Sequence, residues 1–96
     1  MKTYITFYEK EIRAVELLIR DQNDALFSVD NATVKVMDKD DNVVVPETPA
    51  YVVGSSVSFL IGTSVTNVAG EYDIIWKLIK GQYTFYHKTR LVVEDL

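Results

Sequence analysis

The most strand-like stretch of the chain is residues 72–79, which read YDIIWKLI. Successive side chains of a β-strand point to opposite sides of a sheet, so this stretch has two faces. One face is apolar and is assigned to the core: Tyr72, Ile74, Trp76 and Leu78. A turn at residues 80–82, KGQ, and a second strand at 83–93 follow directly. This part of the chain therefore predicts an antiparallel hairpin with one buried face.

The rest of the chain has the same character, with runs of Val, Ile, Thr, Tyr and Phe separated by Gly, Asn, Asp and Pro. Such runs favour strands, and their spacing predicts a sandwich of about seven. Besides the hairpin, the expected strands are 3–8, 12–20, 33–37, 43–45, 51–53 and 56–61. A helix over 10–20 is the alternative for the second of these, because its apolar residues also fit a 3.6 period imperfectly. Pro46 and Pro49 cannot donate to a ladder, so we expect their segment at a sheet edge or crossing between sheets.

Composition sets the class of the protein. The 96 residues, 48% hydrophobic and 25% charged, predict one ordinary globular domain over 1–96. A net charge of −4 with scattered basic residues argues against a nucleic-acid or membrane partner. Cysteine is absent, which excludes disulfides and thiolate chemistry. With neither a signal peptide nor a long apolar run in view, we expect a soluble protein made in a cytoplasm.

The residues that could carry catalysis are few. His87 is the only histidine, so neither a histidine-based triad nor a multi-histidine metal site can be assembled. The neighbouring carboxylates Glu9 and Glu11, and Glu94 and Asp95, are interpreted as solvated surface charge. The glycines are isolated rather than clustered in a phosphate-binding loop. We therefore expect no enzyme activity, no cofactor and no bound metal.

One acidic segment resembles the start of a cation-binding loop. Asp38, Asp40 and Asn42 place oxygen ligands at alternate positions, as a Ca²⁺ loop does. No glycine follows at the sixth position, and Pro46 lies where such a loop would continue. The preferred interpretation is a hairpin turn, in which Asp and Asn side chains bond their own main chain.

A contact surface is predicted on the face of the 72–79 strand that is turned away from the core. Ile75 and Ile79 lie on that face and would be exposed unless something covers them. Tyr4, Tyr8 and Tyr86 could extend this surface, with Tyr83 in place of Tyr86 if the register differs. Contiguous apolar surface on a soluble domain tends to mark a binding site, and tyrosine is favoured at interfaces.

The stretch AGEYDIIWKLIKGQYTFYHKTRLVVEDL at 69–96, together with ATVKVMDKDDNVV at 32–44, resembles small Ig-like domains of tailed-phage virion proteins. The resemblance implies an all-β, immunoglobulin-like β-sandwich of antiparallel strands. Tyr72 resembles the tyrosine-corner position of such domains, where a hydroxyl bonds upstream backbone. Antibody-type domains differ, because this chain lacks their cysteine pair and carries Trp76 in a late strand.

The resemblance implies a non-catalytic structural protein of the virion: a neck, tail, baseplate or capsid accessory protein present in many copies. Its partners would be other virion proteins or further copies of itself, reached through the outer strand face or the edge strand 3–8. The alternative is a carbohydrate- or ligand-binding module that uses loop-borne Tyr and Asp residues. A third option is an accessory domain of an enzyme.

Overall fold

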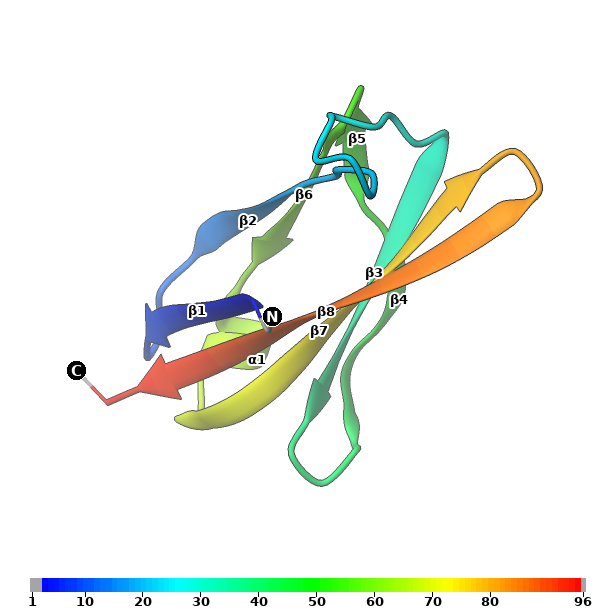
Figure 1. Ribbon diagram of the computed structural model, residues 1–96. Coiled ribbons are helices and arrows are strands. Elements are labelled where there is room, and N and C mark those ends of the chain that lie inside the picture. The colour runs from blue at the N-terminus through cyan, green and yellow to red at the C-terminus, as the bar shows by residue number, and fades with distance from the viewer. Residues whose placement is uncertain (1–2, 96) are drawn as a thin grey trace.

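The computed structural model describes residues 3–95, with side chains from Ile5 onward, and consists of two packed β-sheets (Figure 1). The five-stranded sheet contains, in spatial order, β1 (Thr3–Tyr8), β8 (Tyr83–Glu94), β7 (Gly70–Lys80), β3 (Asn31–Asp38) and β4 (Val43–Pro49). The three-stranded sheet contains β2 (Arg13–Leu18), β6 (Ser56–Ile61) and β5 (Tyr51–Val53). A single helical turn, α1 (Thr63–Thr66), joins β6 to β7.

This arrangement confirms the predicted immunoglobulin-like β-sandwich of about seven strands, and each of the eight expected segments overlaps one of the eight strands. Strands β3, β7 and β8 correspond to the C, F and G strands of that fold, and β2, β6 and β5 to its B, E and D strands. One strand departs from the expected antiparallel pairing, because β1 runs parallel to β8. The helical alternative for residues 10–20 is wrong, since β2 pairs with β6 over its whole length.

The core follows the period-two pattern. The face of β7 assigned to the core is buried, with Ile74 and Trp76 fully so. Phe7, Val34 and Leu91 contribute further fully buried side chains from the neighbouring strands. The indole Nε1 of Trp76 donates to the hydroxyl of the buried Thr89 at 3.0 Å, so burying this polar group leaves no donor unsatisfied.

The tyrosine corner is confirmed at the connection between α1 and β7. The hydroxyl of Tyr72 donates to the main-chain oxygen of Val68 at 2.7 Å. The buried ring lies on the core face of β7, so this bond ties the helical connection to the core. Burial also raises the pKa of Tyr72 above its ordinary value, because the charged phenolate loses hydration.

The proline-containing segment was predicted to end as a strand at Val45, and this boundary is wrong. Strand β4 continues through Pro46 and Pro49 as the edge of the five-stranded sheet. An edge strand needs main-chain donors on one side alone, so prolines are tolerated there. The β3–β4 ladder contains register shifts, as bulged edges do. The predicted edge position is confirmed.

The two sheets differ in length, which shapes the surface at one end of the sandwich. Strands β7 and β8 contain 11 and 12 residues, whereas β2 and β6 contain 6 each. The tip of the β7–β8 hairpin therefore extends past the shorter sheet and past β1 (Figure 1). Gly81 forms its two-residue turn with a positive φ of 59°, a conformation typical of glycine at the first position of a type II′ turn.

Candidate functional site

Four of the five predicted contact residues share the outer face of the five-stranded sheet: Tyr8, Ile75, Ile79 and Tyr86. Tyr86 lies opposite Lys77 of β7, on the face that Ile75 and Ile79 also occupy. Ile75 and Ile79 are half-buried, whereas Tyr86 is 69% exposed. Tyr8 is on the same face but lies opposite Glu94, eight residues further along β8, or about 27 Å away. The side chain of Tyr4 lies outside the described residues.

Charged side chains divide this outer face. Arg90 bonds Asp73 at 2.9 Å and approaches Glu71 at 3.6 Å, and Lys77 lies 3.9 Å from Glu47. Ile75 stands between Lys35 of β3 and Lys88 of β8 in the ladders. Within residues 5–95, neither of these two lysines has an ion pair or a side-chain hydrogen bond. The outer face thus has an apolar centre flanked by two cations that form no ion pair with the described residues.

A second feature was not predicted: a cleft of about 650 Å³ between the two sheets, beside the tip of the β7–β8 hairpin. Its walls come from the end of β2 and the loop after it, from β7, and from the N-terminal half of β8. The lining residues are Leu17–Asn23, Phe27, Leu78 and Phe85–His87. The cleft exists because the three-stranded sheet ends before the hairpin does.

Aromatic rings gather at this cleft. The ring of Phe27, from the loop between β2 and β3, meets Phe85 edge-on with centroids 6.1 Å apart. Tyr83 stacks on Phe85 at 6.5 Å, and the Lys80 ammonium lies 5.4 Å from the centre of the Phe27 ring. Phe85 remains 44% exposed and Tyr83 61% exposed. The alternation of β8 places both on the core side, but no strand of the shorter sheet reaches them.

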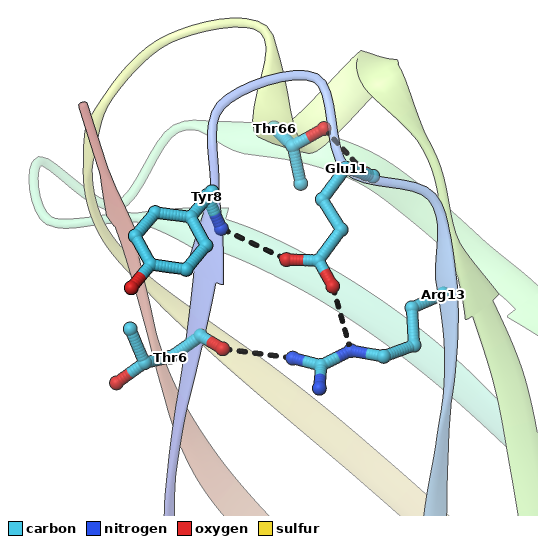
Figure 2. A network of polar contacts seen from close by, with 5 residues as sticks. All are labelled: Thr6, Tyr8, Glu11, Arg13 and Thr66. Carbon is cyan, nitrogen blue, oxygen red and sulfur yellow. Dashed lines mark hydrogen bonds and ion pairs between the residues drawn. The ribbon is translucent and has the colours of Figure 1, made fainter. Parts of the chain in front are cut away.

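The other end of the same gap between the sheets is closed by side chains (Figure 2). Arg13 of β2 lies over the Phe7 ring at 4.2 Å, bonds the Glu11 carboxylate at 3.2 Å and donates to the main-chain oxygen of Thr6 at 2.7 Å. Glu11 in turn accepts from the main-chain N–H of Tyr8 at 2.9 Å. Thr66 donates its hydroxyl to the Glu11 main-chain oxygen at 2.8 Å, which ties this loop to α1.

The acidic segment forms the predicted hairpin turn. The carboxylate of Asp38 accepts from the main-chain N–H groups of Asp40 and Asn42, both at 2.9 Å. These bonds lower the pKa of Asp38, the bond from Asn42 most strongly. Asp41 takes the left-handed conformation, with a φ of 63°. Across the described residues, no three His, Cys, Asp or Glu side chains form a group that could hold a metal ion.

The titratable residues singled out from the sequence occupy separate places. His87 is half-buried in the cleft wall, and burial lowers its pKa. The carboxylates Glu9 and Glu11 are close in sequence but make different contacts in the structure. Glu11 belongs to the network around Arg13, whereas Glu9 lies beside Asp95 at the end of β8. A hydrogen bond with Asp95 raises the pKa of Glu9. The only described helix is α1, at four residues far too short to cross a membrane.

The cleft aromatics Phe27 and Phe85 were missed, and alternation alone assigns Phe85 to the core. Tyr83, the alternative contact residue, lies on the core side of β8 and not on the outer face. The available signal was strand length: the expected 83–93 strand was longer than any strand predicted for the rest of the chain. A strand that extends beyond the sheet it faces must leave part of its inner face uncovered.

No protein-family model matches the chain, and no curated protein sequence matches it either. Among solved structures, a family 123 glycoside hydrolase from Clostridium perfringens, studied for glycolipid glycan hydrolysis, is similar with a TM-score of 0.57 at 9% identity. That similarity covers 99% of this chain but 23% of the hydrolase, so the chain spans less than a quarter of that protein's length.

The Ig-like domain of mouse leukocyte-associated immunoglobulin-like receptor 1, solved as a strand-swapped dimer, is similar with a TM-score of 0.50 at 15% identity. Here 96% of this chain and 88% of the other are covered. At such low identity the likeness concerns the fold alone. The chain is an Ig-like β-sandwich.

Proposed function

We propose that this domain is a non-catalytic interaction module that binds a larger protein assembly through the outer face of its five-stranded sheet. The observation that carries the proposal is the arrangement around Ile75, an apolar side chain between Lys35 and Lys88, with the exposed Tyr86 close by. A partner with apolar residues and carboxylates would bury Tyr86 and pair the lysines. Tyrosine at the centre of a contact and charge at its rim are typical of specific interfaces.

The assembly we propose is the virion of a tailed phage, with the domain as a neck, tail, baseplate or capsid accessory protein made in the host cytoplasm. The support for this setting is the sequence resemblance of residues 69–96 and 32–44 to virion Ig-like domains. A small sandwich without an evident constellation of catalytic side chains suits such a role. The expected partners are other virion proteins and further copies of this chain, not nucleic acid or membrane.

The test is co-sedimentation of the purified protein with isolated capsids and isolated tails of a phage that encodes it. We expect binding to one of the two fractions, weakened at least tenfold by Ile75→Asp, because a carboxylate would replace the apolar centre of the contact. The matched control is Val53→Asp on β5, an exposed apolar residue of the other sheet. Absence of binding to both fractions, or equal loss with both variants, would contradict the proposal.

A second candidate function is ligand or carbohydrate binding in the cleft between the sheets. The observation that favours it is the aromatic wall of Phe27 and the 44% exposed Phe85 beside the polar residues Arg20 and Asn23. Exposed rings with nearby hydrogen-bonding groups are suited to stacking on sugars. A glycan array probed with and without Ca²⁺ tests this function, and a signal lost in Phe85→Ala would favour it over the virion role.

A further inference from the structure

The edges of the five-stranded sheet differ in how they are protected from other strands. Unpaired main-chain groups at an edge are a template for pairing with another chain, and proteins usually block them. The β4 edge carries Pro46 and Pro49 and an irregular register. The β1 edge is capped by the network of Figure 2, in which Arg13 and Glu11 occupy the main-chain oxygen of Thr6 and the N–H of Tyr8. Both of these edges are blocked within the chain.

The N-terminal half of β8, residues 83–88, has no such protection. Strand β1 pairs with residues 89–94 alone, so no described strand lies beside 83–88 on the side away from β7. The main-chain oxygen of Glu94 accepts from Glu9, which shows that even-numbered residues of β8 direct their main-chain groups away from β7. By the alternation of an antiparallel ladder, Thr84 and Tyr86 therefore present N–H and C=O groups at this open edge.

The sequence of the open edge favours pairing. It reads YTFYHK, in which the first four residues are strand-forming, and it contains no proline and no carboxylate. The ladder to β7 is regular across it. Tyr83, Phe85 and Tyr86 are 61%, 44% and 69% exposed, so three aromatic side chains lie in solvent within four residues. An added strand would bury all three and satisfy the free main-chain groups.

We propose that the open edge pairs with the same edge of a second copy of this chain, antiparallel, about a two-fold axis at Phe85. In this register the main-chain N–H and C=O of Thr84 form hydrogen bonds with those of Tyr86 in the second copy. Tyr86 pairs with Thr84 of the second copy in the same way, so the contact has two hydrogen-bonded residue pairs. Phe85 faces its own counterpart on the core side, next to the Phe27 ring. Tyr83 lies opposite His87 of the second copy. The two five-stranded sheets become one continuous sheet.

Charge favours a second copy as the occupant. The open edge carries Lys88 and His87 but no acid, and in this register Lys88 lies opposite the neutral Gln82 of the second copy. The carboxylates of the β3–β4 turn and those of Glu94 and Asp95 lie towards the far end of β8, since Asp38 pairs with Tyr72 and Tyr72 with Leu91. A carboxylate also lies at the hairpin turn, where Asp30 accepts from the Gly81 N–H at 2.6 Å, beside the Gln82 that lies opposite Lys88 of the second copy. The edge is self-complementary, as a two-fold contact requires.

This contact is made by the strand edge and not by the outer face: the two contacts share Tyr86 and Lys88, but the edge contact involves neither Ile75 nor Lys35 and does not depend on the virion setting. The two proposals can also fail separately. A protein that dimerises but does not bind phage particles would contradict the virion role and support the edge contact. A monomer that binds particles would support the virion role and contradict the edge contact.

The first experiment is light scattering coupled to size exclusion over a wide range of protein concentration. We expect the apparent molar mass to double as concentration rises. Phe85→Lys places a charge at the axis and is expected to keep the protein monomeric at every concentration. The matched control is Tyr51→Lys, which changes an exposed aromatic residue on the β5 edge of the other sheet and should leave the dimer intact. Circular dichroism establishes that both variants fold.

A crosslink tests the register, because the chain has no cysteine of its own. Directly opposite residues in a non-hydrogen-bonded pair have Cα atoms about 4.5 Å apart, within the range of a disulfide. Phe85→Cys is therefore expected to form a disulfide dimer on mild oxidation. Thr84→Cys is expected to stay uncrosslinked, since two copies of Thr84 would lie more than about 7 Å apart. A wild-type protein that is monomeric at all concentrations, or equal crosslinking of both variants, would overturn the proposal.

Discussion

The two halves of β8 have similar strand-forming sequences but opposite surroundings. Residues 89–94 lie between β7 and β1, and their core-facing side chains Thr89, Leu91 and Val93 are buried. Among the described strands, β7 alone pairs with residues 83–88, and their core-facing Tyr83 and Phe85 remain exposed. The difference arises from the lengths of the neighbours: β1 and the three-stranded sheet both end before the hairpin does.

The gap between the sheets shows the same division. Beside the C-terminal half of β8, Arg13 and Glu11 close the gap and cap the β1 edge. Beside the N-terminal half, the gap is the aromatic cleft. One end of the sandwich is thus closed by side chains, and the other leaves apolar surface and main-chain groups uncovered. Surfaces kept open in this way cost stability and are usually retained for binding.

The largest expected difference between the halves is in the free energy of unfolding. Leu91→Ala should lower it by about 2–5 kcal/mol, because the fully buried side chain leaves a cavity. Phe85→Ala should cost about 1 kcal/mol or less in the monomer, since its ring is already half in solvent. Urea unfolding of both variants at low protein concentration measures the two values. Similar costs at the two sites would contradict the division of β8.

A smaller effect is expected at the tyrosine corner, which supports the closed half because Tyr72 lies opposite Leu91. Tyr72→Phe removes the bond to the Val68 main-chain oxygen and should lower the free energy of unfolding by about 1 kcal/mol. The ring stays in the core, so packing is retained. Thermal unfolding of the variant and of the wild type measures the difference. An unchanged unfolding midpoint would show that the tyrosine corner adds no stability.

The cap on the β1 edge should be visible in amide exchange more than in stability. Glu11→Ala removes the acceptor for the Tyr8 N–H and should make that amide exchange faster, with a stability loss of about 1 kcal/mol or less for so exposed a contact. Glu11→Gln retains a side-chain oxygen and is the control. If the Tyr8 amide exchanged equally in wild type and Glu11→Ala, the edge would not be capped as described.

The smallest effect is a pH dependence that arises in the cleft wall. Burial lowers the pKa of His87 below its ordinary value of 6.5, so the folded state favours the neutral ring. Its contribution to stability is therefore full above pH 6.5 and declines as the pH falls from 6.5 towards the folded-state pKa. His87→Gln should flatten the stability profile in that window. Arg20 and Asp21, which line the same cleft, are unchanged in this comparison.

The sequence was sufficient to predict the fold class, the hairpin, the core face of β7, the Asp38 turn and the role of Tyr72. Each of these depends on local alternation or on side chains that bond nearby main chain. The parallel pairing of β1, the extension of β4 through Pro49 and the short helix α1 were not predicted. They depend on which strands become neighbours, and residue types along one strand do not encode this.

The candidate site was predictable in part. Alternation correctly placed Ile75 and Ile79 on the outer face, but it could not show that Lys35 and Lys88 would flank Ile75 from two other strands. The aromatic cleft could not be predicted from the sequence for a related reason. Phe85 has the pattern of a core residue, and its exposure follows from the end of a different sheet, far away in sequence.

Residue-resolved hydrogen exchange along β8 tests the central claim, that its N-terminal half is an open edge used for pairing with a second copy. At low protein concentration, the amides of Thr84 and Tyr86 should exchange fast, whereas those of Arg90 and Val92, beside β1, should be protected. Raising the concentration should slow Thr84 and Tyr86 alone. Strong protection of Thr84 and Tyr86 in the dilute monomer, or exchange that does not respond to concentration, would contradict the account.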